Sequence, residues 1–163
     1  LTADDAEGLI VRPHSTADDS IPNHDGLIAQ NLVRLAALTG DTKWRERIDA
    51  LFAALLPNAT ATGFGQLSLM NALDLRLTGA EIVVVGEGAQ ADALLSVARK
   101  LPHATNIVLH APRADALPPD HPARAKADSV QGAAVFVCRN QSCSLPVTTP
   151  EALIDLVKQR VSA

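Results

Sequence analysis

The sequence predicts a mixed α/β protein, in which a helical segment precedes a small α/β module of three to four strands with a βαβ unit. Before Gly79, apolar residues recur at the three- and four-residue spacing of amphipathic helices. After Gly79, short β-branched runs alternate with helical patterns, as in proteins with parallel strands. The 163 residues, of which 47% are hydrophobic and 20% charged, are typical of a globular chain. We therefore expect two units, residues 1–79 and residues 80–163.

The first two helices are predicted from capping residues as well as from periodicity. Asn23 or Asp25 can accept the free N–H groups of a first turn, and Gly40 favours a left-handed helix end. After a cap at Asp41, a second helix should continue until Pro57, which we expect to end it. The very short connection predicts an antiparallel pair. The apolar stripes expected to face the core are Leu27, Ile28, Leu32, Leu35 and Leu38 in the first helix, and Trp44, Ile48, Leu51, Phe52, Leu55 and Leu56 in the second.

A third helix is expected over about residues 65–78, with Leu67, Met70, Leu73 and Leu77 on one face. The three apolar faces together need more partner surface than the remaining chain offers. The first residue is Leu1 rather than Met, which suggests a processed or truncated chain. We therefore expect these helices to be the end of a larger helical assembly.

The second half begins with a strand over residues 82–85, whose continuous apolar run suits burial on both faces. A following helix and a second strand over residues 106–110 complete the βαβ unit. Four prolines in "PRADALPPDHPARAKADS" indicate a solvated loop with at most a helical turn. A third strand is expected over residues 133–138, with a short fourth folded back over residues 144–147. Pro150 then opens the last helix.

The turn after the first strand has the pattern G-x-G-x-x-A, formed by Gly86, Gly88 and Ala91. Such a turn binds dinucleotides when its backbone approaches a pyrophosphate and an acidic residue at the end of the second strand binds the ribose. Here the second strand ends in His110 where the acidic residue should be, and Glu87 adds negative charge to the loop. We therefore expect a tight structural turn and no cofactor, with a nucleotide-binding βαβ module as the alternative.

The most polar segment of the first half, "TADDSIPNHDG", supplies candidate substrate-binding residues, which are Asp18, Asp19, Asn23, His24 and Asp25. Paired carboxylates beside an imidazole can perform acid–base chemistry when burial separates their pKa values. The same residue types also favour a solvated loop that caps a helix, so both interpretations remain open. The chain contains no G-x-S-x-G, Walker or H-E-x-x-H motif, and we assign no catalytic residue.

Two cysteines, Cys138 and Cys143, lie close together in "CRNQSC". They are open to three interpretations: two reduced structural thiols, a reversible redox pair, or half of a metal site. The histidines are scattered without metal-ligand spacing, so we expect no metal centre. A formal net charge of -4 without a basic cluster argues against nucleic-acid partners, and no apolar run reaches the ~20 residues of a membrane span. Few cysteines and no recognisable leader favour the cytoplasm.

Four segments together resemble a known family: "DDSIPNHDGLIAQNLVRLAALTGD", "FGQLSLMNALD", "EIVVVGE" and "VFVCRNQSCSLPVTTPEAL". They are similar to the C-terminal end of the large thioredoxin-domain proteins related to spermatogenesis-associated protein 20. In that family, a strand is followed by Cys, a few polar residues, Cys and Pro-Val-Thr-x-Pro. The corresponding residues here are Cys138, Cys143, Pro146, Val147, Thr148 and Pro150.

The resemblance implies a thioredoxin-like domain, an (α/α)6 toroid of the six-hairpin glycosidase type and a small α/β region. This chain would then contain the last toroid helices and the α/β region, with the N-terminal remainder of the same protein as its partner. The family's pocket loop, an acidic residue followed by x-x-Pro-Ser-Gly-Asn, corresponds here to residues 18–25, which read Pro-Asn-His-Asp after Ile21.

The expected function is therefore that of a C-terminal structural portion without catalysis of its own. The alternative is that residues 18–25 form part of the pocket of a carbohydrate-active enzyme, epimerase- or glycosidase-like, with a saccharide as ligand. A nucleotide-binding module is the second alternative.

Overall fold

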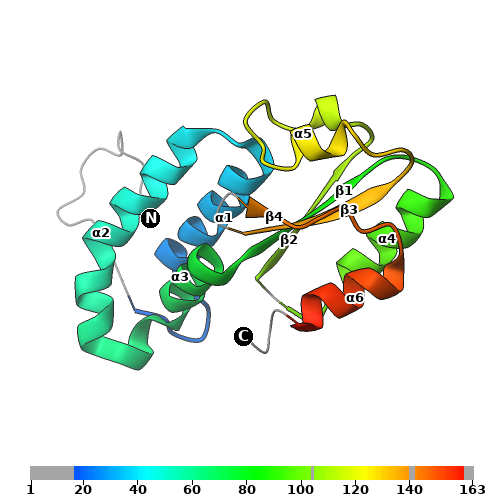
Figure 1. Cartoon of the computed structure of the whole chain (residues 1–163). Helices are drawn as coiled ribbons and strands as arrows, with labels where there is room; N and C mark the ends of the chain where they lie inside the picture. Colours follow the sequence, from blue (N-terminus) through cyan, green and yellow to red (C-terminus); the bar gives the residue numbers. More distant parts are fainter. Residues whose placement is uncertain (1–16, 104, 140–141, 160–163) are drawn as a thin grey trace.

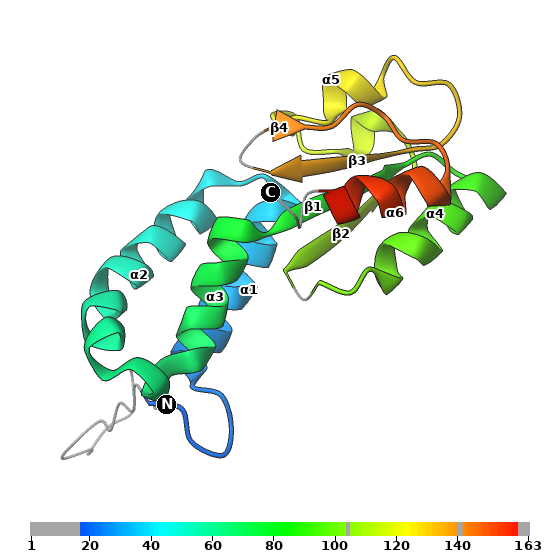
Figure 2. The same ribbon diagram turned by 60° about the horizontal axis from the view of Figure 1, so that its bottom comes forward.

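The computed structural model describes residues 17–103, 105–139 and 142–159. Within these ranges the chain forms six α-helices and a four-stranded mixed sheet (Figure 1). Three helices, α1 to α3, form a unit at one end of the sheet (Figure 2). The predicted mixed α/β class is confirmed. No helix in the described ranges combines the length and the apolar character needed to cross a membrane.

The helical unit begins with α1 (His24–Thr39), whose two ends form as predicted. The Asn23 side chain accepts the N–H of Asp25 at 2.7 Å, and Gly40 ends the helix with φ of 69°. Both features satisfy backbone groups that a helix end leaves unpaired.

The second helix, α2 (Thr42–Thr62), is longer than the sequence predicts. Asp41 caps it as expected, accepting the N–H of Lys43 at 2.9 Å. The expected end at Pro57 is wrong, because the helix continues through this residue. Proline removes a single bond to the carbonyl four residues earlier. That carbonyl belongs to Ala53, an exposed residue, so water can replace the missing donor.

A short 3-10 turn, η1 (Gly63–Gln66), leads into α3 (Leu67–Thr78). Figure 2 shows α1 and α2 antiparallel and α3 returning beside α1 toward the sheet. The start of α3 lies against the start of α1, since a Cβ on Gly26 would be 2.5 Å from the carbonyl carbon of Ser68. Glycine is therefore needed where the two helix backbones meet.

The sheet has the strand order β2-β1-β3-β4. Its first strand, β1 (Ala80–Val85), pairs in parallel with β2 (Asn106–Ala111), and α4 (Ala89–Lys100) connects the two. The predicted βαβ unit is confirmed. On the other side of β1, β3 (Ala134–Arg139) runs antiparallel. The two central strands are buried on both faces, which agrees with their continuous apolar sequences.

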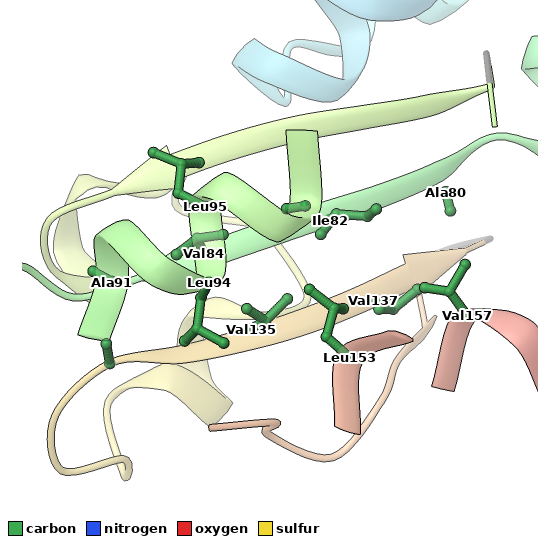
Figure 3. Close-up of a cluster of buried hydrophobic side chains, with 12 residues drawn as sticks. Ala80, Ile82, Val84, Ala91, Leu94, Leu95, Val135, Val137, Leu153 and Val157 are labelled. Atoms are coloured by element: carbon green, nitrogen blue, oxygen red, sulfur yellow. The ribbon is translucent and has the colours of Figure 1, made fainter. Parts of the chain in front are cut away.

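One face of the sheet packs against α4 and α6 (Pro150–Gln159). Side chains of both helices meet alternate residues of β1 and β3 in a single cluster (Figure 3). The labelled members of that cluster are Ala80, Ile82, Val84, Ala91, Leu94, Leu95, Val135, Val137, Leu153 and Val157.

The opposite face is covered by the proline-rich segment, which was expected to be a solvated loop. This expectation is wrong in part. The segment forms η2 (Ala114–Ala116) and α5 (Arg124–Ala127), joined by a connection that buries Leu117 and His121. Their small side chains pack against Phe136, which is fully buried. Many residues of this contact are alanines. Alanine contributes little to a hydrophobic periodicity, so the sequence pattern did not indicate the contact.

The fourth strand differs from its expected position. The described part of β4 is Ser142–Cys143, and Val147 forms an isolated bridge to Val135. Between them, the Ser144 hydroxyl accepts the N–H of Val137 at 3.1 Å. In a regular strand pair, a backbone carbonyl would accept this N–H. Pro146 has no N–H to donate. The strand expected over residues 144–147 is therefore interrupted.

Candidate functional site

The loop before α1 places Asp18 at the start of α3. The carboxylate of Asp18 accepts the N–H and the hydroxyl of Ser68 at 2.7 and 2.5 Å, and the N–H of Asn23 at 2.7 Å. Partial burial alone would raise the pKa of Asp18, but these hydrogen bonds outweigh it and hold the pKa below its ordinary value. Asp18 thus acts as a cap of α3, supplied from outside that helix.

The other candidate residues of the loop have different surroundings. Asn23 caps α1, and its amide nitrogen donates to the carbonyl of Ala17 at 3.2 Å. His24 and Asp25 lie 3.2 Å apart at the first turn of α1, whereas Asp19 is exposed. The geometry agrees with a capping loop. A saccharide-binding role for these residues stays a prediction.

The glycine turn is explained by close packing at one position and by backbone conformation at the other. Gly86 has φ of 117°, and a Cβ there would lie 2.7 Å from the Cα of Ala133. Gly88 has φ of 83° in open space, and it precedes the first turn of α4. Both positions therefore require glycine without any ligand. Nucleotide binding at this turn also stays a prediction.

The two cysteines form a disulfide between β3 and β4. Cys138 and Cys143 are directly opposite each other in the antiparallel pair, and both are buried. Of the three interpretations left open by the sequence, two reduced structural thiols disagree with this disulfide, whereas a redox pair is compatible with it. Whether the disulfide is reversible stays a prediction. Within the described ranges, no group of three or more His, Cys, Asp or Glu side chains could hold a metal ion.

A cleft of about 300 Å³ lies between the helical unit and the sheet. Its walls come from α1, α2, α3, the three longer strands and the connection before α5. One part of the lining is apolar, with Val33, Ile48 and Ile107 among its members. The polar part consists of Arg45, Arg76, Glu81, Asp120, His121 and Arg139, together with Thr42 at the start of α2. We call this space the interlayer cleft.

A histidine–carboxylate pair forms one wall of the interlayer cleft. His121, with 3% of its side chain exposed, has Nε2 at 3.2 Å from Oε2 of Glu81. Its Nδ1 accepts the N–H of Ala123 at 3.1 Å, so a neutral ring has its proton on Nε2, although the contact of Nε2 with Glu81 does not have hydrogen-bond geometry. Glu81 is also the cross-strand partner of Cys138. The pair therefore joins the connection before α5 to β1, beside the disulfide.

Two arginines of the interlayer cleft have buried donors. Arg139 donates from one terminal nitrogen to the carbonyl of Thr78 at 3.1 Å, and Arg76 lies 3.6 Å from Asp49 at the surface. The Nε atoms of both arginines are buried, and neither has a hydrogen-bond partner among the described residues. Such groups are uncommon in folded proteins and usually have a solvent or ligand partner.

This cleft could not be predicted from the sequence. Its polar residues are spread from Thr42 to Arg139, and no short motif contains two of them at a spacing that indicates chemistry. His121 lies in the segment that was expected to be solvated.

The outer surface of α1 is the second notable feature. The inward side of this helix contains mainly small residues: Gly26, Ala29, Val33, Ala36 and Ala37. Four of the five residues predicted to face the core face outward instead, with exposed fractions of 45%, 42%, 37% and 41% for Leu27, Ile28, Leu35 and Leu38, whereas Leu32 is partly buried against the helical core. These four residues lie within about 100° of the helix circumference, from the 3.6-residue period. We call them the α1 stripe.

Comparison of the chain with protein-family models, with curated proteins and with solved structures found no match.

Proposed function

We propose that this chain is a structural portion of a larger helical protein and that the α1 stripe packs against further helices of it. The expected architecture is the end of an α/α toroid followed by the α/β module. The observation that supports the proposal is the pattern of burial along α1, which buries mainly small residues and exposes four of its large apolar ones.

A helix that is apolar on both sides usually lies between two partners. The inward side of α1 already has its partner, because it packs against α3, α2 and Ile107 of β2. The α1 stripe has no such cover within the described residues. A contiguous apolar surface of this kind typically marks an interaction site.

The distribution of exposed apolar side chains supports the same conclusion. Among the described residues, the large hydrophobic side chains that are exposed are Ile21, Leu27, Ile28, Leu35, Leu38, Leu67, Leu77 and Leu145. All of these except Leu145 belong to the helical unit or to the loop before it. The α/β module, in contrast, has covered both faces of its sheet. The exposed apolar side chains are therefore concentrated on the helical unit.

The proposal is tested by replacing Leu35 with glutamine in two settings. In the isolated 163-residue chain the free energy of unfolding should change by less than about 0.5 kcal/mol, as for other surface sites. In the protein as its source cells produce it, the same change should lower stability by about 1.5 kcal/mol, because burial of the leucine is lost. Denaturant unfolding of both forms measures the two values.

Leu145→Gln is the matched control, since Leu145 is 81% exposed on the α/β module. It should have little effect in either setting. If Leu35→Gln also has the same small effect in both settings, the α1 stripe is a solvent-facing surface and the proposal is wrong.

A further inference from the structure

The two edges of the sheet, as the described residues form it, differ in their protection. At the β4 edge, Lys126 donates to the carbonyl of Cys143 at 2.5 Å, and Pro146 follows without an N–H group. The other edge is β2, which Figure 2 shows at the margin of the sheet. Its sequence, NIVLHA, contains no proline and no Lys, Arg, Asp or Glu. The residue types that usually protect an edge strand are therefore missing from β2.

The outward side of β2 carries unpaired backbone groups. The N–H of Gly86 donates to the carbonyl of Ala111 at 3.0 Å, so Ala111 and every second residue before it face β1. The alternate residues Asn106, Val108 and His110 therefore direct their backbone N–H and C=O groups away from the sheet.

Most of these outward groups lack a partner. The N–H of Asn106 donates to the carbonyl of His103 at 3.1 Å. The carbonyl of Asn106 and both backbone groups of Val108 and His110 have no hydrogen-bond partner within the described ranges. His110 is exposed and Val108 is half-buried, so this edge is open to solvent. Donors and acceptors that alternate along an extended strand are matched by a second extended strand.

We propose that β2 pairs with β2 of a second copy of this chain, across a two-fold axis at Val108. Identical strands related by such an axis run antiparallel, and the interface is self-complementary. Each Val108 then exchanges both backbone hydrogen bonds with Val108 of the second copy, and each His110 donates its N–H to the carbonyl of Asn106 of the second copy. All outward donors of both strands are satisfied.

The side chains favour a second copy as the occupant and Val108 as the centre. Directly opposite residues of an antiparallel pair lie on the same face. In this register Val108 is opposite Val108, and Asn106 is opposite His110. A shift that places Val108 opposite His110 keeps as many backbone bonds but loses this match. Because β2 contains no charged residue, the pairing brings no like charges together.

The pairing involves no residue of the α1 stripe, so it is independent of the proposed function. Sedimentation equilibrium of the 163-residue chain should show a reversible dimer with a dissociation constant below about 100 µM. Amide hydrogen exchange locates the interface. Exchange at Val108 and His110 should slow by roughly threefold or more between about 10 µM and about 1 mM chain. The amide of Asn106, already bonded to His103, is the internal control and should change little.

Two variants remove the pairing in different ways. Val108→Lys places like charges opposite each other at the axis, and His110→Pro removes an outward N–H that β1 does not use. Each should weaken dimerisation by about tenfold or more. Proline is tolerated on an edge strand where the N–H faces solvent, so His110→Pro should fold even if Val108→Lys does not.

Leu35→Gln is the matched control, because a dimer formed through the α1 stripe would respond to it. It should leave the dimerisation of the chain unchanged. The proposal is overturned if the chain stays monomeric at about 1 mM. It is equally overturned by a dimer that withstands His110→Pro or that is lost in Leu35→Gln, since the interface would then lie elsewhere.

Discussion

Replacement of Gly26 by alanine should lower the free energy of unfolding by about 3 kcal/mol. The sign is opposite to that expected from helix propensity, which favours alanine over glycine in a helix interior by about 1 kcal/mol. The difference arises because the added Cβ would lie 2.5 Å from the backbone carbonyl carbon of Ser68. A backbone atom cannot move aside as a flexible side chain can, so α1 and α3 must separate.

Gly65→Ala is the control for this prediction. Gly65 also belongs to the helical unit, but a Cβ there would have no atom within 4 Å. Denaturant unfolding should therefore show Gly65→Ala to be close to the unchanged chain. Equal stabilities of the two variants would contradict the close approach of α1 and α3.

Replacement of Asp18 by alanine should lower the free energy of unfolding by about 2–3 kcal/mol at pH 7, because one carboxylate accepts three hydrogen bonds. The cost should depend on pH. The folded-state pKa of Asp18 lies below its ordinary value, so its stabilisation is fully present above that value and is lost as the pH falls through the folded-state pKa. The difference between the two proteins should shrink below about pH 4.

Asp19→Ala separates this structural role from a binding role of the loop. Asp19 is exposed, and its replacement should change stability by less than about 0.5 kcal/mol at any pH. Urea unfolding between pH 2 and pH 7 measures both variants. A difference for Asp18→Ala that stays constant down to pH 2, or an equal cost for Asp19→Ala, would contradict the capping interpretation.

Much of the fold could be predicted because local signals and packing agree. Asn23, Gly40 and Asp41 cap the helices that they were expected to cap, and the β-branched run of β1 lies in the centre of the sheet. The prediction failed at Pro57, where one missing hydrogen bond did not outweigh the rest of the helix. It also failed in the proline-rich segment, where burial depends on alanines.

The candidate sites were less predictable, for two physical reasons. Periodicity identified the large residues of α1 as an apolar stripe, but it could not determine which side the chain itself covers. The close approach at Gly26 and Ser68 selects the side with small residues. The interlayer cleft, in turn, exists only after folding brings Arg76, His121 and Arg139 together from separate elements.

The most direct test of the proposed packing is photo-cross-linking from the α1 stripe in the protein as its source cells produce it. A benzoyl-phenylalanine at position 38 should cross-link to a helix outside residues 17–159 of the same molecule, identified by mass spectrometry of the joined peptides. The same probe at position 145 should give no such product, because Leu145 lies on the α/β module. Absence of cross-links from position 38, or cross-links to a second copy of this chain, would contradict the account.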